Sequence, residues 1–77
     1  MTQRLVVKYQ GGPDQQKEKA IARAVRWKIK GTGYNFATDE RDVEFHLPPN
    51  YDNTNLEAAI LAIDPLATIA LYPATPS

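Results

Sequence analysis

Apolar and polar residues alternate in four separate segments of this chain. Alternation with a period of two is typical of a strand that buries one face, so each segment predicts a strand. The four strands are expected over residues 4–10, 33–38, 41–48 and 67–73. The side chains expected to point into the core are those of Leu5, Val7, Tyr9, Tyr34, Phe36, Val43, Phe45, Leu47, Ile69 and Leu71.

A first helix is predicted from Pro13 to Lys30, where apolar residues recur with the helical period. Pro13 suits the first turn of a helix, and Asp14 is favourable at its positive end. Gly31 is typical of the residue at which a helix stops. This helix would follow directly on the glycine turn that ends the first strand.

A second helix is predicted over residues 55–64, ending before Pro65. Thr54 and Glu57 have the spacing of a capping box, in which each side chain bonds a backbone amide at the start of the helix. The apolar face would consist of Leu56, Ile60 and Ile63.

The predicted order is strand, helix, strand, strand, helix, strand. The second and third strands are joined around residues 39–41, which is short enough for a hairpin. The commonest solution for this order is an α+β ferredoxin-like sandwich, a four-stranded antiparallel sheet with two helices on one face. Right-handed crossovers would place the first and third strands at its centre. We expect a single domain over residues 1–77, with residues 73–77 as a flexible tail.

Composition narrows the classes of function. The 77 residues contain no cysteine and one histidine, so disulfides and thiolate metal sites are excluded, and we predict no metal and no cofactor. The apolar run near the amino terminus is too short for a signal peptide, and no segment is apolar for 18 residues, so we expect no membrane association. We predict a cytoplasmic protein. Because so small a chain buries little apolar surface, a homodimer would add to its stability.

The formal net charge of zero conceals two halves of opposite sign. Residues 1–30 contain eight basic and two acidic side chains, a net charge of +6, whereas residues 31–77 have a net charge of −6. Such halves either attract each other within the fold or present separate patches to partners.

Four cations of the first half have the spacing of one helical stripe. At 100° per residue, Lys19, Arg23, Arg26 and Lys30 fall within about 60° of one another, opposite the apolar face, over roughly 16 Å of helix. The stripe is either a solvated face or a surface for something anionic, an acidic protein or a nucleic acid. Trp27 falls at the margin of the apolar arc, where it is either a core residue, the reading we favour, or an anchor at an interface.

Other polar groups give weaker signals. Asp42, Glu44 and His46 share one side of the third predicted strand, but a strand spaces them nearly 7 Å apart, so we expect a polar surface with a Lys8–Glu44 ion pair. The glycine turns at residues 11–12 and 31–33 lack the spacing of phosphate-binding loops. With one histidine and a single serine at the terminus, no catalytic residues are predicted.

The sequence therefore predicts a non-enzymatic interaction module that binds another protein or itself. Its candidate contact surface contains Lys19, Arg23, Arg26, Lys30 and Trp27. The alternative is a nucleic-acid-binding domain that uses the same basic stripe. Against this alternative, the isoelectric point is near 6.5 and the predicted sheet aromatics face the core instead of forming a stacking platform.

Overall fold

The computed structural model describes residues 2–73 as four strands and two helices in the predicted order. The elements are β1 (Gln3–Gln10), α1 (Gln15–Val25), β2 (Gly31–Asn35), β3 (Glu40–Leu47), α2 (Leu56–Ile63) and β4 (Thr68–Tyr72). Apart from Pro73, the predicted tail lies outside the described residues.

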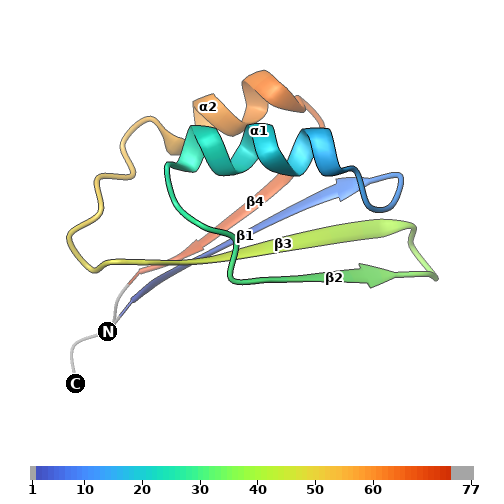
Figure 1. Cartoon of the computed structure of the whole chain (residues 1–77), viewed down its shortest axis with the longest axis horizontal. Helices are drawn as coiled ribbons and strands as arrows, with labels where there is room; N and C mark the ends of the chain where they lie inside the picture. The colour runs from blue at the N-terminus through green and yellow to red at the C-terminus, as the bar shows by residue number, and fades with distance from the viewer. Residues whose placement is uncertain (1, 74–77) are drawn as a thin grey trace.

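The strands form one antiparallel sheet in the order β2-β3-β1-β4, and both helices cover the same face of it (Figure 1). This confirms the ferredoxin-like α+β sandwich and the central position of the first and third strands. Two layers suffice because each strand and each helix has only one apolar side to bury.

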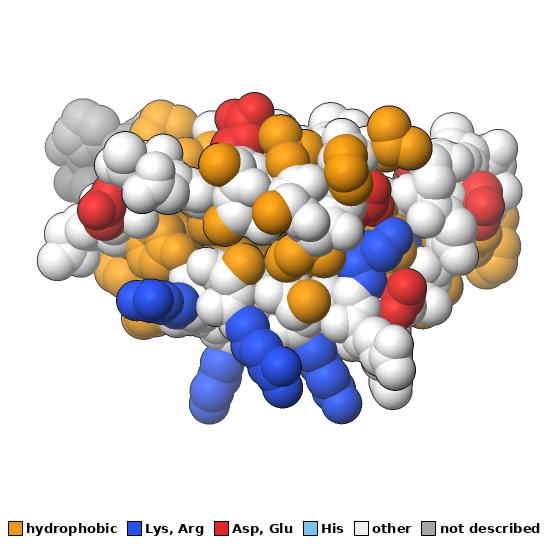
Figure 2. Space-filling model, turned by 90° about the horizontal axis from the view of Figure 1, so that it is seen from above, with side chains coloured by type: hydrophobic (Ala, Val, Ile, Leu, Met, Phe, Trp, Pro, Cys, Tyr) orange, Lys and Arg blue, Asp and Glu red, His pale blue; other side chains and the backbone are white. Residues whose placement is uncertain are grey.

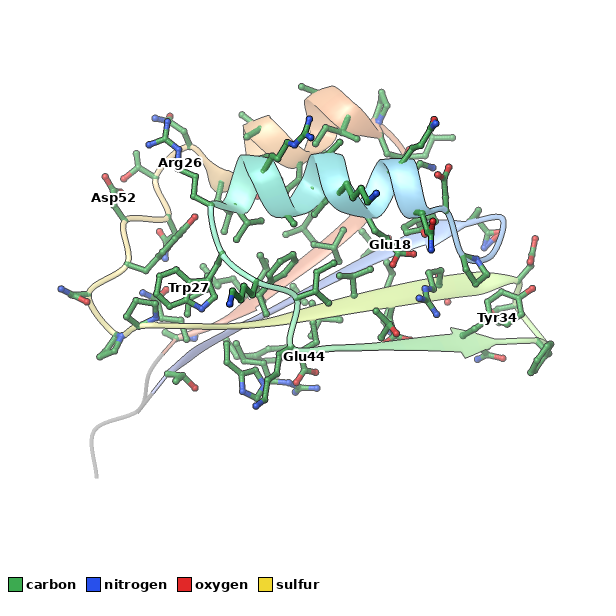
Figure 3. All side chains as sticks on the ribbon, viewed as in Figure 1. Glu18, Arg26, Trp27, Tyr34, Glu44 and Asp52 are labelled. Atoms are coloured by element: carbon green, nitrogen blue, oxygen red, sulfur yellow. The ribbon has the colours of Figure 1, made fainter. Side chains whose placement is uncertain are left out.

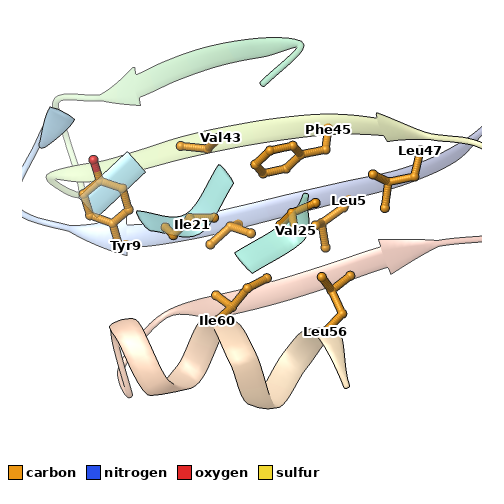
Figure 4. Packing of buried hydrophobic residues seen from close by; sticks show 10 residues of the cluster. Leu5, Tyr9, Ile21, Val25, Val43, Phe45, Leu47, Leu56 and Ile60 are labelled. Carbon is orange, nitrogen blue, oxygen red and sulfur yellow. The ribbon is translucent and has the colours of Figure 1, made fainter. Parts of the chain in front are cut away.

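The core lies between the two layers (Figure 4). Leu5 and Tyr9 from β1 and Val43, Phe45 and Leu47 from β3 point toward the helices, as predicted. Val7 of β1 belongs to the same cluster. From the helices, Ile21, Val25, Leu56 and Ile60 close the core, and α1 packs against α2. Leu71 was expected in the core but remains exposed, because β4 is an edge strand that the helices cover only in part.

The hairpin between β2 and β3 differs from the prediction. The strand begins at Gly31 and ends at Asn35, and residues 36–39 form the turn, in which Asp39 has a positive φ of 55°. Phe36 therefore lies in the turn with 88% of its surface exposed instead of in the core. Its ring contacts that of Tyr34 edge to face, at 4.8 Å between centroids.

The starts of the two helices are stabilised in different ways. At α1, the Asp14 carboxylate accepts a 3.1 Å hydrogen bond from the Lys17 amide, which is the bond of a helix N-cap. At α2, the predicted capping box is absent, since the N-cap residue is Asn55 and makes no side-chain cap bond. The Thr54 hydroxyl instead donates to Asp52, at 2.6 Å.

Candidate functional site

Exposed cations gather along one edge of the helical layer (Figure 2). We define the basic surface as the exposed cations of residues 19–30, namely Lys19, Arg23, Arg26, Lys28 and Lys30. No carboxylate within residues 2–73 lies within 4.0 Å of any of these five side chains. Of the cations elsewhere, Lys17 pairs with Asp64 at 3.0 Å and Arg41 pairs with Glu18 at 3.1 Å. The basic surface is therefore a concentration of positive charge that the described part of the fold does not neutralise.

This surface is not the single helical stripe that the sequence predicted. The α1 helix ends at Val25, and Arg26 adopts the left-handed conformation, with a φ of 61°. The amides of Arg26 and Trp27 both bond the Ala22 carbonyl, at 2.8 and 3.4 Å, which closes the last turn. Lys19 and Arg23 remain on the helix, about 6 Å apart along its axis. Lys28 and Lys30 instead lie on the segment that leads to β2.

The early end of α1 has a tertiary cause. A longer helix would carry the chain away from the sheet. Instead, the Lys30 amide donates a 2.8 Å hydrogen bond to the Glu44 carbonyl of β3, on the side where β2 pairs. Ile29, the residue before Lys30, packs against the core. The chain leaves the helix at Val25, five residues before the predicted end at Lys30, and this carries Trp27 off the apolar arc.

Trp27 is exposed over 46% of its surface, so its expected place in the core is wrong. It lies beside the end of the sheet, below the helix (Figure 3). Arg26, Trp27 and Lys28 line a shallow hollow of about 500 Å³. The partly exposed indole thus shares this hollow with two cations.

A second hollow, of about 460 Å³, lies between the end of α1 and the start of α2. Arg26 and Asp52 both line it and extend on the same side of the molecule (Figure 3), but they do not form an ion pair. The Tyr51 hydroxyl donates to the Val25 carbonyl, and burial raises the pKa of Tyr51. This hydrogen bond fixes the loop before α2 against the end of α1.

The face of the sheet away from the helices is polar, as predicted, but its ion pairs differ. The register places Lys8 opposite Asp42 and Val6 opposite Glu44, so the expected Lys8–Glu44 pair is wrong. Glu44 instead lies 2.8 Å from Arg4 and 2.6 Å from His46. Hydrogen bonds from Arg4 and His46 lower the pKa of the Glu44 carboxyl. Among residues 2–73, no three carboxylate or imidazole groups are placed to hold a metal ion.

A buried polar cluster escaped the sequence analysis. Tyr9 donates a 2.6 Å hydrogen bond to Glu18, and two nitrogens of Arg41 donate to the same carboxylate at 3.1 and 3.3 Å. Burial raises the pKa of Tyr9 to about 12, with the bond to Glu18 adding to the shift. Burial alone would raise the pKa of Glu18, but the bonds from Arg41, Tyr9 and the Asp14 amide outweigh it and lower that pKa.

One signal in the sequence could have found this cluster. Glu18 precedes Val25 by seven residues, so the two lie about 20° apart on the helical wheel, within the buried arc. A carboxylate there requires a partner inside the fold. The hydrogen bonds of the cluster join β1, α1 and β3, and none of its three side chains lines either hollow described above.

Comparisons of the chain with protein-family models, with curated proteins and with solved structures found no match. Within the described residues, neither helix has the length and apolar character needed to cross a membrane. The basic surface and the residues around it are therefore the features of the molecule that bear on its function.

Proposed function

We propose that this chain is a binding module, not an enzyme, and that it holds an anionic macromolecule on its basic surface. The observation that carries the proposal is the contrast between cations. Of the four cations elsewhere in the chain, Arg4, Lys17 and Arg41 have carboxylate partners within 4.0 Å and only Lys8 has none, whereas all five cations of the basic surface have none among residues 2–73.

Like charges this close together repel. Lys19 and Arg23 are one helical turn apart, and such a pair destabilises a helix by a few tenths of a kcal/mol. Ion pairs between exposed side chains contribute little to folding stability. Grouping these five cations on one surface therefore does not stabilise the fold. A polyanion would relieve the repulsion and would release its own counterions on binding, which makes the interaction strong at low salt.

The ion pairs and lowered pKa values of two glutamates support a binding role over catalysis. Glu18 and Glu44 are engaged by cations, and the pKa of each is lowered, so both remain ionised at neutral pH. A general acid or base needs the opposite, a pKa near the working pH and a free path to substrate.

The test compares two charge reversals of equal size. Arg23 lies in the basic surface, whereas Lys8 is exposed on the open face of the sheet. Affinity for poly-L-glutamate and for a 12-nucleotide oligothymidylate would be measured at two salt concentrations. We expect Arg23→Glu to weaken binding about 10-fold or more at low salt and Lys8→Glu to weaken it less than about 3-fold. Circular dichroism would establish that both variants are folded.

The proposal would be wrong if wild-type protein bound neither probe, or if the two variants lost the same affinity, since net charge alone would then explain the effect. A second copy of the chain is also an anionic partner, because residues 31–77 carry a net charge of −6. Light scattering at high micromolar concentration would detect a homodimer, and Arg23→Glu should dissociate one that uses the basic surface.

A further inference from the structure

We infer that the anionic partner is a single-stranded nucleic acid, whose bases stack on Trp27 while its phosphates contact the neighbouring cations. This inference rests on the proposed function and specifies its partner. It follows from the place of one aromatic side chain that the sequence had assigned to the core.

Trp27 combines three properties of a stacking residue. It is exposed over 46% of its surface, it lines a hollow with Arg26 and Lys28, and these two cations flank it in the chain. Proteins that bind single strands combine aromatic side chains for the bases with cations that follow the backbone. Here both kinds of group lie within the same short segment between α1 and β2.

The segment of chain that contains Trp27 carries charge of one sign only. Residues 19–38 contain no aspartate or glutamate, so no fixed negative charge within that segment would repel a phosphate. An acidic peptide would also be attracted, but it would not need a flat exposed ring beside the cations. A duplex would gain little from Trp27, because its bases are already stacked on one another.

The two other strongly exposed aromatic side chains of residues 2–73 are less suited to this role. Tyr72 lies on the open face of the sheet with the Arg4 guanidinium 5.3 Å from its ring, and that face also carries Asp42 and Glu44. Phe36 is at the hairpin tip, against the ring of Tyr34. Of these three exposed aromatics, Trp27 shares its hollow with two cations and no carboxylate.

Trp27 is the only tryptophan of the chain, so its fluorescence reports on the proposed contact. The full chain would be titrated with 12-nucleotide oligothymidylate, with a 12-unit abasic strand that has the phosphates without the bases, and with poly-L-glutamate. We expect oligothymidylate to quench the fluorescence in a saturable, salt-sensitive manner. The abasic strand should bind about 10-fold more weakly and should leave the emission nearly unchanged.

Variants then separate stacking from charge. With a fluorescein-labelled strand, Trp27→Ala should lose about 10-fold in affinity for oligothymidylate and less than about 2-fold for the abasic strand. Trp27→Phe keeps an aromatic ring, so its affinity for oligothymidylate should fall between those of wild type and Trp27→Ala. It therefore tests stacking even if the alanine variant fails to fold. Phe36→Ala is the matched control, since it removes an exposed ring outside the basic surface and should change neither affinity.

Failure of this inference can be told from failure of the proposed function. Equal affinity for oligothymidylate and the abasic strand, unchanged by Trp27→Ala, would overturn base stacking and leave the binding module in place. Tighter binding of poly-L-glutamate than of oligothymidylate would identify an acidic protein as the partner. If no probe bound at low salt, both the inference and the function would be wrong.

Discussion

Tyr9 on β1 and Glu18 on α1 are joined by a 2.6 Å hydrogen bond at the edge of the hydrophobic core. Arg41 on β3 completes the contact by donating to both oxygens of the same carboxylate. One acidic side chain thus ties the first helix to the two central strands. This fixes how α1 lies on the sheet, and with it the direction in which the basic surface faces.

Replacing Glu18 by alanine should lower the free energy of unfolding by about 2–4 kcal/mol. The substitution leaves the Tyr9 hydroxyl and the Arg41 guanidinium in a largely buried place without their acceptor, which is the costly half of breaking a buried pair. Urea unfolding would measure the loss. The control is Glu57→Ala at an exposed position of α2, where a change of about 0.5 kcal/mol or less is expected.

The same carboxylate should make stability depend on pH on the acid side. The pKa of Glu18 is lowered in the folded state, so its contribution is fully present above the unfolded pKa of about 4.3 and is lost as the pH falls through the lower folded value. We expect wild-type protein to lose more stability between pH 5 and pH 3 than Glu18→Gln, which does not titrate. Parallel pH profiles for the two proteins in urea unfolding would refute this role.

Asp14 and Thr54 should differ in their importance as helix caps. Asp14→Ala removes the acceptor of the Lys17 amide at the start of α1 and should cost about 1 kcal/mol. Thr54→Ala removes only an exposed bond to Asp52 and should cost about 0.5 kcal/mol or less. Thermal or urea unfolding of the two variants decides the matter. A larger loss for Thr54→Ala would mean that the capping box predicted from the sequence does form.

Arg26→Gly should stabilise the fold, by about 0.5–1 kcal/mol. Arg26 holds a left-handed conformation at the end of α1, where a side chain is unfavourable and glycine is not. Arg23→Gly, three residues earlier inside the helix, should instead destabilise by about 1 kcal/mol. If both variants lost stability in urea unfolding, the arginine at position 26 would be making a contact worth more than the strain. Both should weaken binding to the anionic probes, because each removes one cation of the basic surface.

The sequence by itself determined the elements with a strong period and the order in which they occur. In β1 and β3, alternation correctly identified the six side chains that pack against the helices, because a register shifted by one residue would turn all of them to the other face. The order of elements then left few topologies, so the arrangement of the sheet also followed. Four of the five cations of the basic surface were likewise recognisable as a run of charge, whereas Lys28 joined them only through the early end of α1.

Only the tertiary structure decided where α1 ends. The exposure of Trp27, on which the proposed stacking depends, follows from that end. The helical period continues through Trp27 and Ile29, so the local sequence does not stop the helix at Val25. The helix stops there because the Lys30 amide must reach the Glu44 carbonyl of β3. The same kind of long-range demand pairs Glu18 with Arg41, which are 23 residues apart. Periodicity reports on a residue's neighbours in the chain, whereas a helix end and a buried ion pair depend on groups that only folding brings together.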